Sequence, residues 1–368
     1  MKSIRILLIL YLVMNPFIKE TKLHAQSLHL ARVEHVKGFP SDEAGIEKGV
    51  SACFAGTVDN MLLMAGGCNF PEKPAAEGGL KRYYQGIYAA EITRENQLKW
   101  TLVGKLPQPC AYGVSIPLPS GLLCIGGNNL NESFDSVFEI ILKNGKATLK
   151  PFPSLPIKMD NFAGACDGNQ VVVSNGLQTF ALKLNQLEDG WETLQPLTPK
   201  KLSQPVGVFV DGNYCQWGGC TAKTATEDCE LNLSGQCLDK PTTTLAPPKN
   251  NDGEDIFLGG AAAISLTPQT FVAVGGVNKD IFLDAVNHPK PGYMTHPAEW
   301  YRFNPFICIY ENGAWKIAGT EKIAARAGTT LAKHGNDIYV IGGELKPGVR
   351  TPDIYRLTFK QPIPHENH

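Results

Sequence analysis

The chain has 368 residues and an almost balanced charge, with 34 basic and 35 acidic side chains and a formal net charge of -1. No basic block stands out along it, which argues against a nucleic acid as its partner. Beyond the N-terminus no apolar run approaches the ~20 residues that a membrane-spanning helix needs, so we expect the mature protein to be soluble.

The first 25 residues are typical of a secretory signal peptide. Lys2 and Arg5 form a short basic start, an apolar core follows over residues 6–14, and Ala25 stands where cleavage requires a small residue. A membrane anchor is the alternative, but the apolar core is shorter than a spanning helix. We therefore expect export from a bacterial cell, to the periplasm or the medium, and one domain over residues 26–368.

The clearest internal signal is a repeated unit with an early small residue, a turn, and a short apolar strand that ends in a glycine doublet. In the third unit Asn-Gly replaces Gly-Gly. Such repetition is typical of propellers, and the units are somewhat longer than a kelch blade of about 50 residues. The six units contain residues 54–67, 112–127, 162–176, 205–219, 259–276 and 325–343.

The strands of these units are apolar on both faces. Residues 62–64 (LLM) and 171–173 (VVV) show no alternation of polar and apolar side chains, which indicates burial on both sides. Glycine at the strand end permits the backbone angles and close approach of a crowded centre. One four-stranded unit cannot cover its own faces, whereas six around an axis can. The sequence therefore predicts an all-β, six-bladed β-propeller of the kelch type without a long helix.

The strands that follow the glycine doublets and the N-terminal segment complete the predicted ring. Trp100, Trp191 and Trp315 follow the doublets of their units, and the large area that a Trp buries favours packing between blades over ligand contact. The last unit runs out near Phe359 after three strands. We therefore expect residues 28–37 to supply the outer strand of the last blade and to cover its open edge.

The chain has ten cysteines, and seven of them fall into two groups. Those within apolar strands are expected to be core residues. Others lie in a polar insertion, where export would permit a disulfide whose pairing the sequence does not give. A zinc site is the alternative there, although no C-x-x-C spacing is present. The expected core residues are Cys53, Cys124, Cys166 and Cys308, and the insertion contains Cys220, Cys229 and Cys237.

Three segments carry a resemblance to a known family. They are AGGCNF with EGGLKRYY (residues 65–70 and 77–84), AYGVS with IGG (residues 111–115 and 125–127), and IGGELKPGVRT (residues 341–351). Together they resemble the N-acetylneuraminate epimerases, also called sialic acid mutarotases. In better-known members the G-E-x-K-P-G-x-R segment lies mid-chain, so this chain resembles a cyclically permuted member, which a closed ring tolerates.

The resemblance implies a catalytic pair, Glu344 and Arg350, from that segment. It implies a nine-carbon keto sugar acid as substrate, with no cofactor and no metal. Glu344 would take the anomeric proton, and Arg350 would hold the substrate carboxylate, because a planar guanidinium matches two oxygens. Taken without the resemblance, the two residues could be an ion pair that braces a turn. Cys110 departs from the family pattern, which has an arginine near this position.

Other polar residues are weaker candidates for substrate binding. Asn69, Asn128 and Asn278 follow a glycine doublet within two residues, so they could face the channel mouth or form turns. Three more precede strands that should line the centre: Arg326, Asn161 and Gln204. Lys81 and Arg82 could attract an anion at the rim or belong to a solvated loop. His334 is placed at a hairpin turn, away from catalysis.

The segment of residues 288–301 is rich in proline and aromatic side chains, and it predicts either a lid over the channel or an inert loop. A hydrolytic sialidase would carry S-x-D-x-G-x-x-W turns, and none is found. A copper oxidase would need a Tyr/His ligand set, which we do not find. A non-catalytic kelch propeller that binds glycans or a protein partner remains the alternative to a mutarotase.

Overall fold

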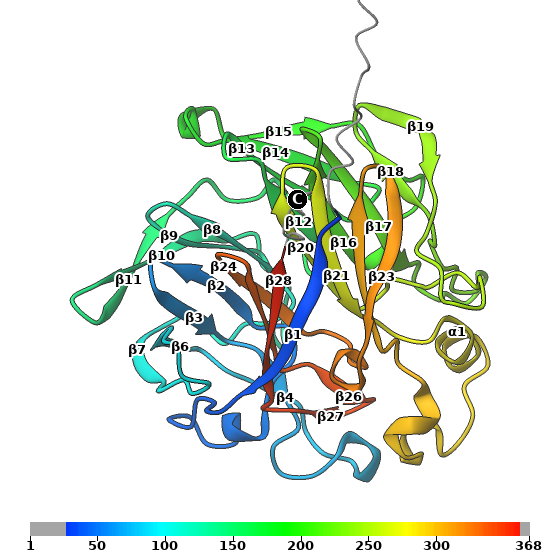
Figure 1. Ribbon diagram of the computed structural model, residues 1–368, viewed down its shortest axis with the longest axis horizontal. Helices are drawn as coiled ribbons and strands as arrows, with labels where there is room; N and C mark the ends of the chain where they lie inside the picture. Colours follow the sequence, from blue (N-terminus) through cyan, green and yellow to red (C-terminus); the bar gives the residue numbers. More distant parts are fainter. Residues whose placement is uncertain (1–26, 361–368) are drawn as a thin grey trace, which may run out of the picture.

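Six four-stranded antiparallel sheets surround one axis in the computed structural model, which describes residues 27–360 (Figure 1). The expected six-bladed β-propeller is confirmed. The signal peptide expected over residues 1–25 lies outside the described residues. Within residues 27–360, no helix is long and apolar enough to cross a membrane.

Each blade begins at the axis and runs outward through four strands. Blade 1 holds β2 (Phe54–Val58), β3 (Met61–Ala65), β6 (Gly86–Glu91) and β7 (Thr101–Lys105). Blade 2 holds β8 (Val114–Leu118), β9 (Gly121–Ile125), β10 (Val137–Lys143) and β11 (Lys146–Pro151). Blade 3 holds β12 (Ala163–Cys166), β13 (Gln170–Ser174), β14 (Thr179–Lys183) and β15 (Trp191–Leu194).

The second half of the ring repeats this order. Blade 4 holds β16 (Ser203–Val210), β17 (Asn213–Cys220), β18 (Gly235–Cys237) and β19 (Lys240–Leu245). Blade 5 holds β20 (Ala261–Thr267), β21 (Thr270–Gly275), β22 (Phe306–Glu311) and β23 (Ala314–Thr320). Blade 6 holds β24 (Thr330–His334), β25 (Asp337–Ile341), β28 (Ile354–Lys360) and β1 (His29–Val36).

Closure of the ring follows the sequence prediction. β1 pairs antiparallel with β28, with Val33 opposite Leu357 and Val36 opposite Ile354. The first strand of the described chain thereby covers the edge that the last strand would expose, and the two ends of the fold hold each other. In Figure 1 the blue β1 and the red β28 lie side by side.

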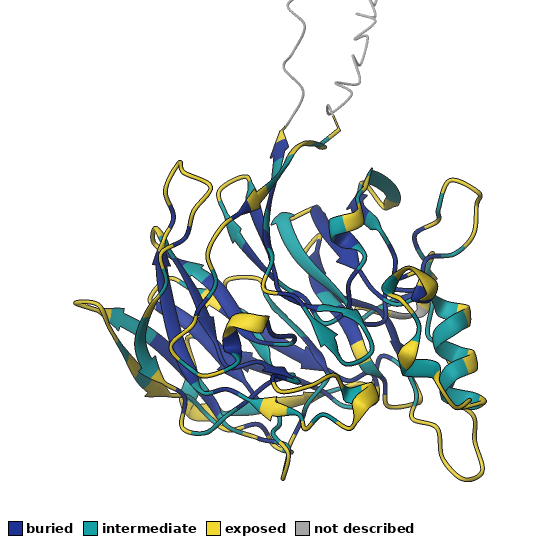
Figure 2. Ribbon diagram, turned by 90° about the horizontal axis from the view of Figure 1, so that it is seen from below, coloured by how far each residue is buried: buried dark blue, intermediate teal, exposed yellow. Residues whose placement is uncertain are grey.

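The core consists of apolar layers between neighbouring blades rather than one central cluster. Figure 2 shows the buried residues concentrated in the strands and the exposed ones in the connecting loops. Val172, for example, packs in the layer between blades 3 and 4, whereas Val173 on the opposite face packs in the layer between blades 2 and 3. This arrangement explains the strands without alternation, because both faces of a blade are covered.

The tryptophans seal the outer ends of these layers, as expected. Trp100, Trp191 and Trp315 are each partly buried against an interblade cluster. Their indole N–H groups donate to backbone carbonyls of the preceding blade or its connection, at Gly38 (3.2 Å), Pro153 (2.8 Å) and Ala246 (3.0 Å) respectively. None of the three lines a cavity near the axis.

A belt of backbone hydrogen bonds encircles the axis just before the innermost strands. One residue per blade contributes to this belt, and each N–H donates to the carbonyl of the previous blade's belt residue over 2.7–3.2 Å. The belt is closed, because Ala52 donates to Gly328. All six residues have left-handed backbones with φ between 52° and 71°: Ala52, Tyr112, Asn161, Gln204, Gly260 and Gly328.

Two short hairpins and one helix interrupt the symmetry at the same end of the ring. β4 (Cys68–Asn69) pairs with β5 (Arg82–Tyr83), and β26 (Glu344–Lys346) pairs with β27 (Val349–Arg350). Short 3-10 segments lie at Ile46–Lys48, Ala75–Glu77, Leu187–Asp189, Tyr293–Thr295, Ala298–Tyr301 and Lys322–Ala324.

As predicted, the described residues contain no long helix, but they contain one short α-helix. α1 (Lys279–Asn287) begins the long connection between β21 and β22, and the side chain of Asn278 caps it by accepting hydrogen bonds from Asp280 and Ile281 N–H. The helix has only nine residues, too few for its periodicity to stand out, and it is held by contact with the rest of the protein rather than by its own propensity. Residues 288–301 continue from it as a loop with two 3-10 turns.

The structure also decides the disulfide question. Cys215 and Cys237 are bonded, and they face each other across β17 and β18. The sequence grouped Cys237 with Cys220 and Cys229, but its partner comes from inside an apolar strand. Cys220 and Cys229 are free. Of the expected core cysteines, Cys53, Cys124 and Cys308 are buried and Cys166 is half-buried.

The first glycine of each doublet explains how tightly the blades meet. A Cβ atom at Gly66 would lie 2.3 Å from the carbonyl oxygen of Cys110, and one at Gly342 would lie 2.3 Å from that of Val50. Both oxygens belong to the backbone at the start of the next blade, so neither can yield without moving that blade. Both glycines also have positive φ, at 65° and 58°.

We expect Gly66→Ala to lower the free energy of unfolding by about 3 kcal/mol or more, because left-handed strain and the backbone clash add. Gly145→Ala is the matched control: its φ is 71°, but nothing lies within 4 Å of the added Cβ. That variant should lose only about 1–2 kcal/mol. Denaturant titration measures both, and equal losses would refute the role given to the interblade contact.

Candidate active site

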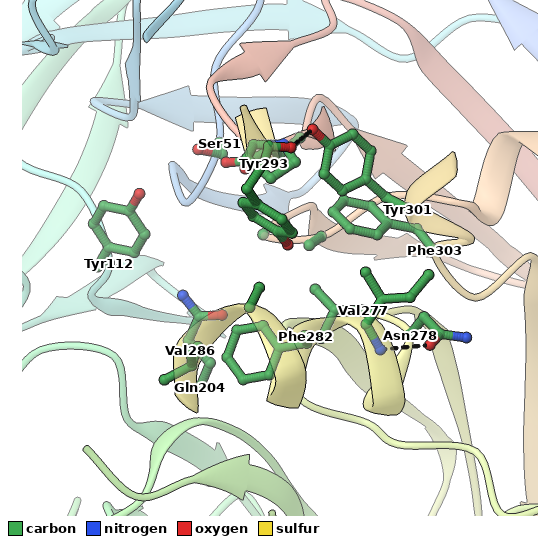
Figure 3. A pocket seen from close by; sticks show the side chains of 16 residues that line it. Ser51, Tyr112, Gln204, Val277, Asn278, Phe282, Val286, Tyr293, Tyr301 and Phe303 are labelled. Carbon is green, nitrogen blue, oxygen red and sulfur yellow. Dashed lines mark hydrogen bonds between the residues drawn. The ribbon is translucent and has the colours of Figure 1, made fainter. Parts of the chain in front are cut away.

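A cavity of about 260 Å³ lies at the end of the axis where the hairpins and α1 gather (Figure 3). This is close to the lower limit of about 300 Å³ for small-molecule sites. The belt residues Tyr112, Gln204 and Gly328 form its floor. The belt therefore separates this cavity from a second one of about 190 Å³, which is lined by uncharged side chains of the innermost strands and of the belt.

One wall of the first cavity is apolar. α1 contributes Ile281, Phe282, Ala285 and Val286 to it, and the chain that follows contributes aromatic rings. Figure 3 shows Phe282 and Val286 on one side of the cavity and Tyr293, Tyr301 and Phe303 across from them. The segment expected to be a lid or an inert loop thus forms part of the wall.

The opposite wall carries Glu344, which the β26–β27 hairpin holds in place. Its backbone exchanges two hydrogen bonds with Ala327, at 2.7 and 2.9 Å, directly before the belt residue Gly328. Its carboxylate pairs with Arg350 across the hairpin, with 2.8 Å between Oε2 and Nη2, and its Oε1 accepts from Gly348 N–H at 3.3 Å. The side chain remains 22% exposed and lines the cavity.

Arg350 lies behind this wall rather than in it. Its side chain is only 4% exposed, and it is absent from the residues that line the cavity. Nε donates to Ser51 Oγ at 3.0 Å, and the guanidinium lies 5.1 Å from the centre of the Phe70 ring. Nη1 is buried and finds no hydrogen-bond partner among the described residues. A buried donor without a partner is costly, so Nη1 is held in place by the ion pair and the packing around the guanidinium.

Opposing forces act on the Glu344 carboxyl. Burial raises its pKa above the ordinary value, whereas the charge of Arg350 and the N–H of Gly348 oppose that rise. For Arg350, burial would lower the pKa, but the negative charge of Glu344 opposes this and the pKa is raised. The pair therefore combines a permanently charged guanidinium with a carboxylate that accepts a proton more readily than an exposed one.

Tyr112 and Lys81 add a second polar group to the cavity. Lys81 Nζ donates to Tyr112 Oη at 2.8 Å and lies 4.5 Å from the centre of that ring. Burial raises the pKa of Tyr112 above its ordinary value. From the sequence, Lys81 could either attract an anion at the rim of the channel or belong to a solvated loop. In the structure it contacts Tyr112, which lines the cavity. Arg82 instead is exposed and bonds to Ala44 O and Glu72.

Sequence reasoning missed Tyr112 and Ser51 as cavity residues. Tyr112 occupies in the second unit the belt position that Asn161 and Gln204 occupy in theirs. Extending that comparison to every unit would have found it. Ser51 stands directly before the belt residue Ala52 and carries no motif of its own, so only its hydrogen bond to Arg350 reveals its place.

Among the weaker candidates, three lie near the cavities. Gln204 lines both cavities, and its amide donates to Asn161 Oδ1 at 3.2 Å. Asn161 lines only the second cavity and also donates to Asp160 at 2.6 Å. Asn278 lines the first cavity, but its side-chain oxygen is engaged in capping α1.

The other three candidates for substrate binding, Asn69, Arg326 and Asn128, bond to the protein itself and line neither cavity. Asn69 is 2% exposed, donates to the carbonyls of Gly45 and Gly49, and accepts from Tyr84. Its predicted place at the channel mouth is corrected, because these bonds direct the amide into the fold.

Arg326 is also 2% exposed, donates to Gly342 O at 2.7 Å and lies against Tyr355. It was expected to contact substrate, but it does not face the cavity. Asn128 exchanges backbone bonds with Ala111 and lines neither cavity. Cys110 is buried behind Gly127. His334 ends β24 at a hairpin turn, as predicted.

No group of three or more His, Cys, Asp or Glu side chains that could hold a metal occurs within residues 27–360.

Comparison with known proteins now identifies the family whose motif forms this wall. A family model described as N-acetylneuraminate epimerase matches residues 15–149 and 152–364. The chain is similar to N-acetylneuraminate epimerases of Salmonella arizonae, at 28% identity over 235 residues, and of Haemophilus influenzae, at 25% over 234 residues.

These two alignments cover 59% and 58% of this chain and 60% of each relative, so the chain matches less than two thirds of their length. The expected cyclic permutation stays a prediction. A solved structure described as "Structure of YjhT" is similar at 22% identity with a TM-score of 0.48, over 59% of this chain and 69% of that chain.

We expect the pKa of the Glu344 carboxyl to lie above that of an exposed glutamate, and Arg350→Met to raise it by a further unit or more, because an opposing charge is lost. Carboxyl ¹³C NMR of glutamate-labelled protein measures this, and Glu344→Gln identifies the signal. A pKa below the ordinary value of 4.5 in the wild type would show that the ion pair outweighs burial.

Proposed function

Because the chain belongs to the N-acetylneuraminate epimerase family, we propose that it is a sialic acid mutarotase that interconverts the α and β anomers of N-acetylneuraminate. The observation that carries the proposal is the position of Glu344. The glutamate of the G-E-x-K-P-G-x-R segment lines an axial cavity, with Arg350 of the same segment bonded behind it. The N-terminal sequence supports placing this activity outside the cytoplasm.

Anomer exchange requires the sugar ring to open and close again. A base takes the proton of the anomeric hydroxyl, the bond between the anomeric carbon and the ring oxygen breaks, and the ring oxygen takes a proton. The resulting carbonyl turns about its bond to the chain, and the same steps in reverse close the ring on its other face. The protein must therefore accept one proton and return one, without oxidation or group transfer.

Glu344 is our candidate for the base. Its carboxylate faces the cavity on one side and is fixed on the other by Arg350 and Gly348. Burial raises its pKa towards the working range, which strengthens it as a proton acceptor. General-base catalysis contributes about 10²–10⁴-fold, a sufficient amount for a reaction that also proceeds unaided.

Tyr112 is placed to supply the proton that the ring oxygen needs. Its hydroxyl accepts a hydrogen bond from Lys81 and also contacts Cys68, so its proton turns from Cys68 to reach the ring oxygen in the cavity. The positive charge of Lys81 also favours the phenolate that is formed for a moment when the proton leaves. In the return step the phenolate takes the proton back.

The substrate is an anion, and the polar wall provides the positive charge to receive it. Lys81 and Arg350 both approach this wall. Because Arg350 lies behind the wall and is only 4% exposed, we assign it the role of attracting the carboxylate by its charge from behind Glu344. The apolar wall formed by α1 suits the acetamido methyl group and the carbon-bound hydrogens of the sugar.

We expect Glu344→Gln to reduce kcat by about 10²–10⁴-fold, because the amide cannot accept the anomeric proton. Proton NMR of freshly released α anomer measures the rate. Glu192→Gln is the control, since Glu192 is an exposed residue of the outer strand β15 and should leave the rate unchanged. Equal decay with and without wild-type protein would instead favour a non-catalytic glycan-binding propeller.

We expect kcat to fall as the pH drops through the pKa of Glu344. The base must be ionised, and its carboxylate form is present only above that pKa. Since burial raises this pKa, the acidic limb of the pH profile should lie above the 4.5 of an unperturbed glutamate. The unaided rate at each pH is subtracted. A flat profile down to pH 4 would remove Glu344 from the role of base.

A further inference from the structure

Two free cysteines lie in contact beside the wall of the active-site cavity. Cys220 ends β17, and Cys229 lies in the connection to β18. Cys220 forms an antiparallel bridge with Leu231, and Thr221 N–H donates to Glu230 O at 2.9 Å. Cys229 stands two residues before Leu231, and the bond from Thr221 continues the pairing of the two segments towards it.

The two thiols meet where these segments pair. Each thiol is close enough to the other to act on its pKa. Cys229 is 3% exposed, whereas Cys220 is half-buried and is the one that solvent reaches. The same blade already contains the disulfide between Cys215 and Cys237, so this part of the fold is compatible with oxidation.

The connection that carries Cys229 also holds the end of α1. Cys229 N–H donates to Asn287 Oδ1 at 2.8 Å, and Asn287 Nδ2 donates back to the Cys229 carbonyl at 3.0 Å. Lys223 Nζ adds a bond to the Asn287 carbonyl. Asn287 is the last residue of α1, and the preceding Ala285 and Val286 line the cavity. The cysteine pair and the cavity wall are therefore linked through one side chain.

We propose that Cys220 and Cys229 form a redox-active thiol pair, which closes to a second disulfide and thereby fixes the cavity wall formed by α1. The oxidant is a small disulfide such as oxidised glutathione. The Cys220 thiolate attacks one of its sulfurs and releases one small thiol. The Cys229 thiolate then attacks Sγ of Cys220 and releases the second. The small disulfide gains two electrons and the two thiol protons, and the protein loses them.

The environment of the pair makes this reaction slow. Burial raises the pKa of Cys220 to about 12, and burial also raises the pKa of Cys229. Since the thiolate is the attacking form, closure takes place over minutes to hours rather than seconds. The contact between the thiols favours the second step, because the resolving thiol is already next to its target.

Peptide mapping of the purified full chain tests the pair. Trypsin together with a glutamate-specific protease places Cys229 in the tripeptide of residues 228–230, apart from Cys237. After incubation with oxidised glutathione, we expect this tripeptide to be linked to the peptide that contains Cys220, and dithiothreitol to release it. A tripeptide that stays unlinked, while Cys215 and Cys237 remain bonded, would overturn the proposal.

Single variants separate the two steps. Cys229→Ser should stop at a stable glutathione adduct on Cys220, and Cys220→Ser should show neither adduct nor link. Cys308→Ser, which alters another buried free cysteine, should form the link like the wild type. An adduct on Cys229 in the Cys220→Ser variant would contradict the order of attack.

Hydrogen exchange tests the effect of the disulfide on the cavity wall. The result does not depend on whether the protein is a mutarotase. Oxidation should slow exchange in residues 284–288 at least about threefold, because Cys229 can no longer move away with its connection. In Asn287→Ala the link should still form without slowing exchange. Unchanged exchange in the oxidised wild type would refute the coupling to α1.

Discussion

The belt of six backbone hydrogen bonds is the constraint on which the remaining structure depends. Each blade gives one N–H and one carbonyl to it, and each belt residue adopts a left-handed conformation. Four of the six are not glycine, and the strain of about 1–2 kcal/mol at each is comparable to the 0.5–1.5 kcal/mol that a hydrogen bond returns. The belt is therefore close to neutral by itself, and the packing between blades maintains it. The belt holds the start of every blade at the same level along the axis.

The belt also sets the chemistry of the two cavities. On one side only uncharged side chains line the cavity at the axis. On the other side the chain has left the regular blades, and the hairpin that follows β25 brings Glu344 next to Gly328. The same hairpin supplies Arg350, so one short segment provides both the group that needs a raised pKa and the charge that limits the rise. The candidate catalytic side chains thus stand on a floor that the closed belt of backbone hydrogen bonds holds in place.

Asymmetry in a sixfold ring comes from insertions, and the insertions gather at one end. The connection from β21 to β22 forms α1 and the aromatic residues of the cavity wall, and the connection from β17 to β18 binds the end of α1 through Asn287. Two neighbouring blades therefore shape the apolar wall, while blades 1 and 6 provide Lys81 and Glu344 on the polar one. The rigid blades position the groups, and the connections carry what is specific to this chain.

The sequence by itself determined the fold, the closure by β1 and the hairpin that carries the candidate pair. Apolar strands, glycine doublets and the GELKPGVR segment are local patterns, and each reports a local requirement of backbone or burial. The places of Arg326, Asn69 and Tyr112 were decided only by the tertiary structure. Arg326 and Asn69 stand where a ligand contact was expected, yet nearby carbonyls take their donors. The pairing of Cys215 with Cys237, the helix α1 and the position of Arg350 behind Glu344 depend likewise on which segments the ring brings together. The partners of these side chains lie in segments far apart in the sequence, and the spacing of residues along the chain does not predict which of them meet.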